Sequence, residues 1–191
     1  MQNPKQQLRL QLKEKRRTLD AAQRNDWSAR ICAHLENWLA KRQLAGIFGF
    51  RSFADEVWLN DWLDFMSQRI PVALPIARLG GQMDFHRYVK GQELFPNQWG
   101  IEEPSPHEPM ILVQSETVIL VPALAISPFG HRLGYGGGFY DRFLARYPQL
   151  VKVGVVFECF ADQLVPMEEH DIPVDYICHQ NGIYPVPTAG P

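Results

Sequence analysis

The sequence lacks the features that mark several classes of protein. It has only three cysteines, and no two have the C-x-x-C spacing of a zinc or redox site: Cys32, Cys159 and Cys178. No apolar run reaches the roughly 20 residues that a membrane span needs. The N-terminus has no apolar centre of the kind found in signal peptides. We therefore expect a cytoplasmic protein with reduced thiols and no membrane partner.

The whole chain also lacks a large excess of either charge. Its net charge is −2 and its isoelectric point is near 6.3. The charges are unevenly distributed, however. Residues 1–43 hold ten Lys or Arg against four Asp or Glu, a net +6, so the remaining residues carry −8. Such a basic arm suits a nucleic acid, an anionic small ligand or the acidic body itself. The acidic overall isoelectric point argues against a dedicated nucleic-acid binder, and we expect no nucleic-acid partner.

Apolar residues make up 46% of the 191 residues, which is enough for a sizeable core. Apolar periodicity predicts four helices, at residues 4–17, 21–42, 55–69 and 139–147. It predicts strands at residues 44–50, 70–75, 117–126, 151–157 and 174–179, with residues 83–89 in a hairpin. Four prolines indicate an ordered loop over residues 96–110.

This alternation of apolar strands and helices predicts a single α/β domain with a largely parallel sheet covered on both faces. Residues 1–43 form its basic helical arm and residues 44–187 form its α/β body. In such sheets ligands bind at the carboxyl ends of the strands. The strongest strand signal, residues 117–126, is followed directly by glycines. We therefore expect the chemistry of the protein at that point.

The segment HRLGYGGGFYDRF holds four glycines within five residues, at Gly134 and Gly136–Gly138. We call residues 134–138 the glycine loop. Glycines before a helix expose several backbone N–H groups toward one point, and such an array binds phosphate. A dinucleotide fingerprint needs G-x-G-x-x-G, and a P-loop needs a lysine after its last glycine; neither is present. The alternative is a tight strand-to-helix turn that needs glycine only for packing.

A helix N-terminus contributes only about 0.3–1 kcal/mol toward an exposed anion, so a polyphosphate needs further positive charge. Arg132 and Arg142 flank the glycine loop and can supply it. Asp141 is an oxygen ligand of the kind that Mg²⁺ accepts. The segment thus favours a phosphate site that uses cations, a metal or both.

The segment RLGYGGGFYDRFL, preceded by VPALAI, resembles the signature of the 5-formyltetrahydrofolate cyclo-ligase family, whose members are also called 5,10-methenyltetrahydrofolate synthetases. The likeness extends over nearly the whole chain. KQQLRLQLKEKRRTL is similar to the family's basic N-terminal helix, and SFADEV to its segment with a substrate-binding glutamate. QWGIEEP is similar to a tryptophan-containing loop, and VPMEEHDIPVD to an acidic segment near the C-terminus.

The resemblance implies a ligase that uses ATP and Mg²⁺ to convert 5-formyltetrahydrofolate into 5,10-methenyltetrahydrofolate, ADP and phosphate. ATP phosphorylates the formyl oxygen, and N10 of the folate then attacks the activated carbon. The implied fold is a three-layer α/β/α sandwich akin to phosphosugar isomerases, with the N-terminal helices packed on the body. The expected partners are a reduced folate and ATP, and we expect a monomer.

The resemblance also implies roles for individual residues. ATP would contact Lys5, Gln6, Gln7, Leu8 and Arg9, together with Arg132, Leu133, Gly134, Tyr135, Gly136, Gly137, Gly138, Phe139 and Tyr140. The folate would contact Arg51, Glu56 and Trp99, together with Tyr135, Gly136, Gly137, Gly138 and Phe139. The catalytic residues would be Arg132, Tyr140 and Asp141. Mg²⁺ would bind Asp141 and Asp171, with Glu168, Glu169 and Asp175 as alternatives to Asp171.

Other interpretations remain at this stage. Lys5 and Arg9 also suit a solvated basic stripe, and Glu56 suits the first turn of a helix, where the dipole favours an acid. Trp99 suits packing as well as stacking. The whole chain could instead be a phosphosugar isomerase or acyltransferase that needs no ATP, or a nucleic-acid or regulatory module that uses its basic arm.

Overall fold

The structure of the chain, a computed structural model, describes residues 3–187. Its helices are α1 (Pro4–Arg17), α2 (Ala21–Leu39), α3 (Asn60–Met66) and α4 (Phe139–Arg146), with short 3-10 turns at Leu79–Gly81 and Glu158–Phe160. The strands of the main sheet are β1 (Gly46–Phe48), β2 (Val72–Ala77), β3 (Met83–Tyr88), β6 (Thr117–Pro122), β9 (Val151–Val155), β10 (Tyr176–His179) and β11 (Gly182–Pro185). Two small ribbons pair β4 (Phe95–Pro96) with β5 (Glu102–Glu103), and β7 (Ala125–Ile126) with β8 (Arg132–Leu133).

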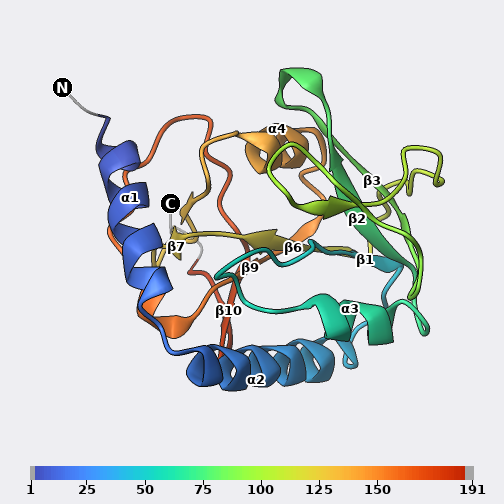
Figure 1. The fold of residues 1–191 in the computed structure, drawn as a ribbon, viewed down its shortest axis with the longest axis horizontal. Coiled ribbons are helices and arrows are strands. Elements are labelled where there is room, and N and C mark those ends of the chain that lie inside the picture. The colour runs from blue at the N-terminus through green and yellow to red at the C-terminus, as the bar shows by residue number, and fades with distance from the viewer. Residues whose placement is uncertain (1–2, 188–191) are drawn as a thin grey trace.

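The main sheet has seven strands in the order β11-β10-β9-β6-β1-β2-β3. The five central strands run parallel, and only the edge strands β3 and β11 are antiparallel. Helices α2 and α3 cover one face and α4 covers the other, which makes three layers (Figure 1). The expected three-layer α/β fold is confirmed. Among residues 3–187 no helix is long and apolar enough to cross a membrane.

The sheet is apolar on both faces because helices cover both. Thr117, Val118, Ile119, Leu120 and Val121 of β6 are all buried, as a continuous apolar run predicts for a central parallel strand. Ile31, Leu35 and Leu39 form the buried stripe of α2. The Asp20 side chain accepts a hydrogen bond from the Gln23 N–H at 2.9 Å and caps this helix.

The strand expected over residues 117–126 is interrupted. It ends at Pro122, which has no N–H to continue the ladder. The chain then turns, Leu124 donates its N–H to the carbonyl oxygen of Leu133, and residues 125–126 pair with β8 instead. This ribbon folds the chain back so that the glycine loop lies beside the end of β6.

The helix expected over residues 55–69 begins only at Asn60. Polar side chains hold the preceding residues in a turn: Ser52 Oγ donates to the Val57 carbonyl oxygen at 2.7 Å and accepts from the Leu59 N–H at 2.8 Å. Such local bonds compete with the helical ladder. Glu56 lies in this turn, so the interpretation as a first-turn helix residue is wrong.

The structure also differs from the expectation in other boundaries and in short elements. Helix α2 ends at Leu39 rather than near residue 42, and the first strand covers only Gly46–Phe48. The proline-rich loop contains the β4–β5 ribbon, and β11 was not expected at all. The ribbon and β11 are short and not strongly apolar, so they leave little periodic signal.

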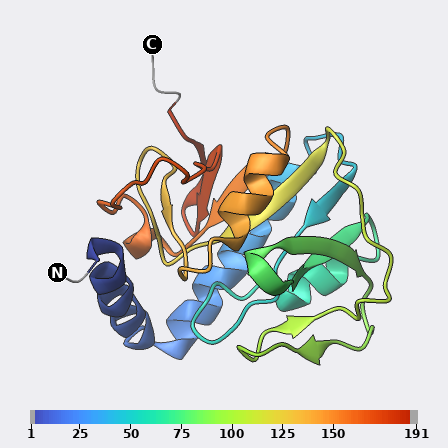
Figure 2. The same ribbon diagram turned by 90° about the horizontal axis from the view of Figure 1, so that it is seen from above.

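Helix α1 lies at one end of the molecule, opposite the β2–β3 hairpin, as both ribbon views show (Figures 1 and 2). It packs on the body through Leu12, Lys5 and Arg16, whose exposed fractions are 5%, 6% and 3%. The interpretation of Lys5 as part of a solvated stripe is therefore wrong. The basic arm turns cations toward the body of the protein.

Candidate functional site

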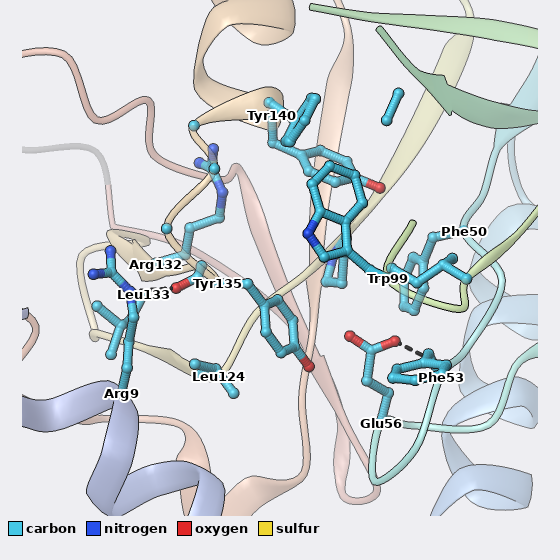
Figure 3. A pocket seen from close by; sticks show the side chains of 18 of the residues that line it. Arg9, Phe50, Phe53, Glu56, Trp99, Leu124, Arg132, Leu133, Tyr135 and Tyr140 are labelled. Atoms are coloured by element: carbon cyan, nitrogen blue, oxygen red, sulfur yellow. Dashed lines mark hydrogen bonds between the residues drawn. The ribbon is translucent and has the colours of Figure 1, made fainter. Parts of the chain in front are cut away.

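A cavity of about 770 Å³ opens at the carboxyl ends of β1 and β6. The chain leaves β1 toward β2 on one side and leaves β6 toward β9 on the other, so this is the point where the strand order reverses. Ligands of open α/β sheets bind at such a point. The cavity is also lined by α1, by the loop that contains Trp99, and by the glycine loop (Figure 3).

Charged side chains in the cavity wall come from separate parts of the chain. Five of the seven Lys or Arg residues in the wall belong to α1: Lys5, Arg9, Lys13, Arg16 and Arg17. The carboxylates come from the body: Asp55, Glu56, Glu102, Glu103, Asp141, Glu168 and Asp171. The charge asymmetry seen in the sequence is therefore concentrated around this cavity.

The glycine loop has the backbone that its sequence suggests. Gly136 and Gly138 have φ values of 104° and 65°, which side-chain-bearing residues rarely adopt. Gly138 is the N-cap of α4 and provides no side-chain cap. The first N–H groups of α4, at residues 139–141, have no acceptor within the helix, and all three residues line the cavity.

Two arginines hold the glycine loop from outside. Arg9 Nε donates to the Gly134 carbonyl oxygen at 2.9 Å. Arg142 donates to the carbonyl oxygens of Gly137 and Gly81, the latter at 2.8 Å, and ties the loop to the turn before β3. Arg142 is exposed and outside the cavity wall, so its expected role as a phosphate-binding cation does not fit.

Arg132 lies at the base of the glycine loop and is 6% exposed. Its Nη2 donates to Asp141 Oδ1 at 2.7 Å, and its Nη1 donates to the Ile172 carbonyl oxygen. Burial lowers the pKa of the Arg132 guanidinium, and the charge of Asp141 opposes that effect. Asp141 Oδ1 also accepts the Ile172 N–H at 3.1 Å. The Arg132–Asp141 pair therefore joins the start of α4 to Ile172, which directly follows the acidic segment at residues 168–171.

Lys5 joins α1 to the same segment. Its Nζ lies 2.7 Å from Asp171 Oδ2 and 3.1 Å from Glu168 Oε2. Burial by itself raises the pKa of Asp171, but the hydrogen bonds from Lys5 and from the Glu168 N–H outweigh it and bring the pKa below its ordinary value. Asp171 is therefore ionised at neutral pH.

The acidic side chains at this end of the cavity have the donor chemistry of a magnesium site. Carboxylate oxygens of Glu168 and Asp171 and a ring nitrogen of His170 lie within 4.8 Å of one another. Asp141 accepts the N–H of Ile172, the neighbour of Asp171, so the two aspartates lie on the same side of the cavity. Mg²⁺ takes oxygen ligands and keeps several waters, and these carboxylates fit that requirement.

Glu56 and Tyr135 face one another across the other end of the cavity (Figure 3). Glu56 Oε2 accepts the Phe53 N–H at 3.0 Å. Burial raises the pKa of Glu56, while a hydrogen bond from the Tyr135 hydroxyl, the Phe53 N–H and the charge of Arg16 counteract the rise. Burial also raises the pKa of Tyr135, which keeps its hydroxyl protonated.

Aromatic and polar side chains complete this end. Trp99 is 49% exposed and meets the edge of Phe139, with ring centroids 5.7 Å apart. Arg51 lies on the wall and donates to Asp64 Oδ1 at 3.3 Å and to Glu102 Oε2 at 3.1 Å. The Tyr140 hydroxyl is buried with no hydrogen-bond partner among residues 3–187, and burial raises its pKa.

The structure brings most of the expected site residues into this one cavity. Lys5, Arg9, Arg51, Glu56, Trp99, Asp171 and the whole segment of residues 132–141 line it. Three residues that we expected to contact ATP do not line this cavity. Leu8 packs against the hydrophobic core, Gln7 is outside the wall, and Gln6 lines a smaller neighbouring hollow with Arg9 and Tyr135.

Arg16 is a site residue that sequence reasoning missed. It is buried in the cavity wall and hydrogen-bonds to the Tyr135 hydroxyl. Its position in the sequence carries a weak signal, because the i+4, i+4 and i+3 steps from Lys5 through Arg9 and Lys13 to Arg16 suggest a common helical side. Nothing in the sequence says that this side faces a ligand rather than solvent.

Comparisons with known proteins all point to one family. The model of the 5-formyltetrahydrofolate cyclo-ligase family matches residues 1–180. The 5-formyltetrahydrofolate cyclo-ligase of Haemophilus influenzae is 30% identical over 178 residues, which cover 89% of this chain and 94% of that protein. The mouse protein of the same name is 29% identical over 194 residues, with 93% and 94% covered.

Solved structures agree with the fold. The NMR structure of Aquifex aeolicus 5,10-methenyltetrahydrofolate synthetase matches with a TM-score of 0.84 and 25% identity, over 98% of this chain and 95% of that one. A 5,10-methenyltetrahydrofolate synthetase from Mycoplasma pneumoniae, 19% identical, matches in fold with a TM-score of 0.76, over 93% of this chain and 99% of that one. With its glycine loop, its basic first helix and a family match over nearly its whole length, the chain belongs to the 5-formyltetrahydrofolate cyclo-ligase family.

Proposed function

We propose that the protein uses ATP and Mg²⁺ to cyclise 5-formyltetrahydrofolate to 5,10-methenyltetrahydrofolate, with release of ADP and phosphate. One observation carries the proposal: a single cavity combines bare helix-terminal amides and buried cations at one end with a carboxylate and aromatic rings at the other. The two ends suit a polyphosphate and a pterin, and the glycines leave no side chain between them. The 191 residues act as one domain in this proposal.

The chemistry needs both ligands in contact. The formyl oxygen attacks the γ-phosphorus of ATP, the bond from that phosphorus to the bridging oxygen breaks, and ADP leaves. The formyl carbon becomes an electrophilic iminium carbon bearing a phosphate ester. N10 attacks this carbon and loses its proton, and the C–O bond breaks to release phosphate. Catalysis of such a transfer is mainly positioning and electrostatic stabilisation.

The ATP phosphates bind at the N-terminus of α4 and the glycine loop. Gly134 has no atom within 4 Å of the place where its Cβ would be, so a ligand can approach the backbone there. Arg9 lies against Gly136, its guanidinium carbon 3.4 Å from the place of a Cβ. Lys5 and Arg9 supply positive charge from α1, and Arg132 supplies it from the base of the loop.

The reduced folate binds at the opposite end. The Glu56 carboxylate accepts hydrogen bonds from N–H groups of the pterin, while Trp99 and Phe139 provide apolar ring faces and edges. Tyr135 and residues 136–138 lie between the folate and the nucleotide. Arg51, held by Asp64 and Glu102, borders the folate.

Asp141 and Asp171 are the residues that would hold Mg²⁺, with Glu168 beside them. When bound, the ion neutralises negative charge on the phosphates. Arg132 stabilises the transferring phosphoryl group, and Asp141 keeps its guanidinium in place. The Tyr140 hydroxyl, protonated and without a hydrogen-bond partner in the described part of the chain, donates a hydrogen bond to the bound ligand.

One assay tests the proposal. The protein is incubated with 5-formyltetrahydrofolate, ATP and Mg²⁺, and the near-UV absorbance of the methenyl product is followed. The absorbance should rise only when all three are present, with one ADP formed per product. Absence of a signal, or a signal that is indifferent to ATP, would refute the proposed reaction. An isomerase or acyltransferase that shares the fold would give no methenyl product.

A further inference from the structure

Arg16 is an unusual side chain for the wall of a cavity. It is 3% exposed, yet among residues 3–187 it forms no ion pair with a carboxylate. Its Nε is buried without a hydrogen-bond partner in the same part of the chain. Buried arginines are normally paired, because taking a charge out of water is costly. Because an unpaired buried guanidinium does not stabilise the fold, the position of Arg16 needs a functional explanation.

The two hydrogen bonds of Arg16 lead from the sheet to the glycine loop. Its Nη2 donates to the Ala123 carbonyl oxygen at 2.7 Å, just after β6. Its Nη1 donates to the Tyr135 hydroxyl oxygen at 3.2 Å. The guanidinium also lies over the Phe160 ring, 5.1 Å from its centroid. Three separate contacts therefore fix the position of Arg16, and Arg16 in turn fixes the tip of Tyr135.

The direction of these hydrogen bonds follows from the chemistry of the groups. A guanidinium can only donate, so the Tyr135 hydroxyl must accept from Arg16. Its own proton can then point toward Glu56, which the hydroxyl faces (Figure 3). A carboxylate has about four lone-pair sites. One oxygen takes the Phe53 N–H, so acceptor capacity remains for the Tyr135 hydroxyl and for a ligand.

We propose that Arg16 is a positioning residue for the folate substrate: it holds the Tyr135 hydroxyl beside Glu56 and places a positive charge behind these two groups. The role rests on the proposed function, because the ligand of Glu56 is the pterin of that reaction. The pterin presents adjacent N–H donors to Glu56. A protonated Glu56 would carry an O–H donor, which would face these N–H groups instead of accepting hydrogen bonds from them.

Other charged groups around Glu56 are few. From α1, Lys13 lies over the Tyr135 ring at 5.4 Å. From α4, Tyr140 faces Glu56. Asp55 of the same turn is paired with Arg24 of α2 at 2.9 Å. Of the cations here, the charge of Arg16 acts against the rise that burial causes in the pKa of Glu56.

The test compares R16M with K15M by steady-state kinetics from pH 5 to 9. Methionine keeps a side chain about as long as the aliphatic stem of Arg16 and removes its charge and donors. In R16M the KM for 5-formyltetrahydrofolate should rise about tenfold at pH 7, since a hydrogen bond to a charged group is lost. The KM for ATP should stay within about twofold. The acid limb of kcat/KM for the folate should move about one pH unit upward, because removal of a nearby opposite charge makes Glu56 easier to protonate.

K15M is the matched control. Lys15 is an exposed neighbour on α1 whose ammonium also lies over Phe160, at 5.4 Å, and it is outside the cavity wall. It should retain wild-type KM values and the wild-type acid limb. If R16M kept both the folate KM and the acid limb of the wild type, or if K15M changed them equally, the role of Arg16 would be refuted.

Y135F covers the case in which R16M does not fold. It removes only the hydroxyl that links Arg16 to Glu56, and should raise the folate KM and move the acid limb in the same direction. In the double variant R16M/Y135F the folate KM should be no more than about twofold above that of R16M, because both changes break one linkage. An unmoved acid limb in Y135F overturns the inference. If the wild-type protein forms no methenyl product, the proposed function fails, whereas a fully active R16M refutes only this role.

Discussion

The ammonium of Lys5 lies 2.7 Å from Asp171 Oδ2, and this contact joins the first helix to a segment 166 residues away. Both side chains are nearly buried, with 8% and 10% of their surfaces exposed. The contact closes one end of the cavity, between α1 and residues 168–171, where we propose that the phosphates bind. It also makes α1 part of the site although the helix lies outside the sheet.

D171N tests this contact through stability. The variant leaves Lys5 with only the half-exposed Glu168 as partner and should lower the free energy of unfolding by about 2 kcal/mol at pH 7. Because the pKa of Asp171 is lowered on folding, its contribution is fully present above its ordinary value of 3.8 and disappears as the pH falls through the folded value. Urea unfolding of both proteins between pH 3 and 7 measures the difference. A gap between the proteins that stays constant over this range would contradict the ion-pair explanation.

D141N tests the proposed role of Asp141 in catalysis. The amide keeps the shape of the side chain but loses the charge that pairs with Arg132 and that, in our proposal, binds Mg²⁺. We expect kcat to fall about 10²-fold or more, and the Mg²⁺ concentration for half-maximal activity to rise. D26N is the control, since Asp26 is exposed on α2 and lies 4.0 Å from Arg30. Wild-type turnover in D141N would show that the metal binds elsewhere.

Two alanine substitutions in the glycine loop should separate backbone strain from ligand approach. G138A forces a φ of 65° on a residue with a side chain and places its Cβ 2.7 Å from Arg142 Nη1. It should cost about 1–2 kcal/mol of stability. G134A meets no protein atom within 4 Å and should leave the thermal midpoint unchanged.

If ATP approaches the backbone where we propose, G134A should nevertheless weaken ATP binding, because its methyl group enters the space of the ligand. Calorimetric titration with a non-hydrolysable ATP analogue measures this effect. Normal ATP affinity in a stable G134A protein would exclude the proposed phosphate position.

Y140F removes a buried hydroxyl that has no partner among residues 3–187. An unsatisfied buried polar group destabilises a protein, so the thermal midpoint should stay the same or rise. Turnover should fall about tenfold, the usual scale for one lost hydrogen bond to a charged group, if the hydroxyl donates to bound ligand. Unchanged kcat and KM values would mean that Tyr140 only packs.

Local sequence signals were enough to predict much of the fold. The apolar stripes of α1 and α2, the cap at Asp20 and the continuous apolar run of β6 each act over a few residues. The glycine loop was equally clear, since positive φ angles at Gly136 and Gly138 need glycine. Predictions failed at the turn of residues 52–58 and at Pro122, where side-chain hydrogen bonds or a missing N–H override periodicity.

The sequence by itself determined the alternation of strands and helices, the flexible backbone before α4 and the excess of positive charge in the first 43 residues. These depend on local periodicity, backbone sterics and composition. Tertiary structure alone decided which cations face the cavity: Lys5 meets Asp171 and Arg16 meets Tyr135, whereas Arg142 turns away and holds main-chain carbonyl oxygens. Such pairings depend on where distant segments pack, and nothing in the neighbouring residues encodes that position.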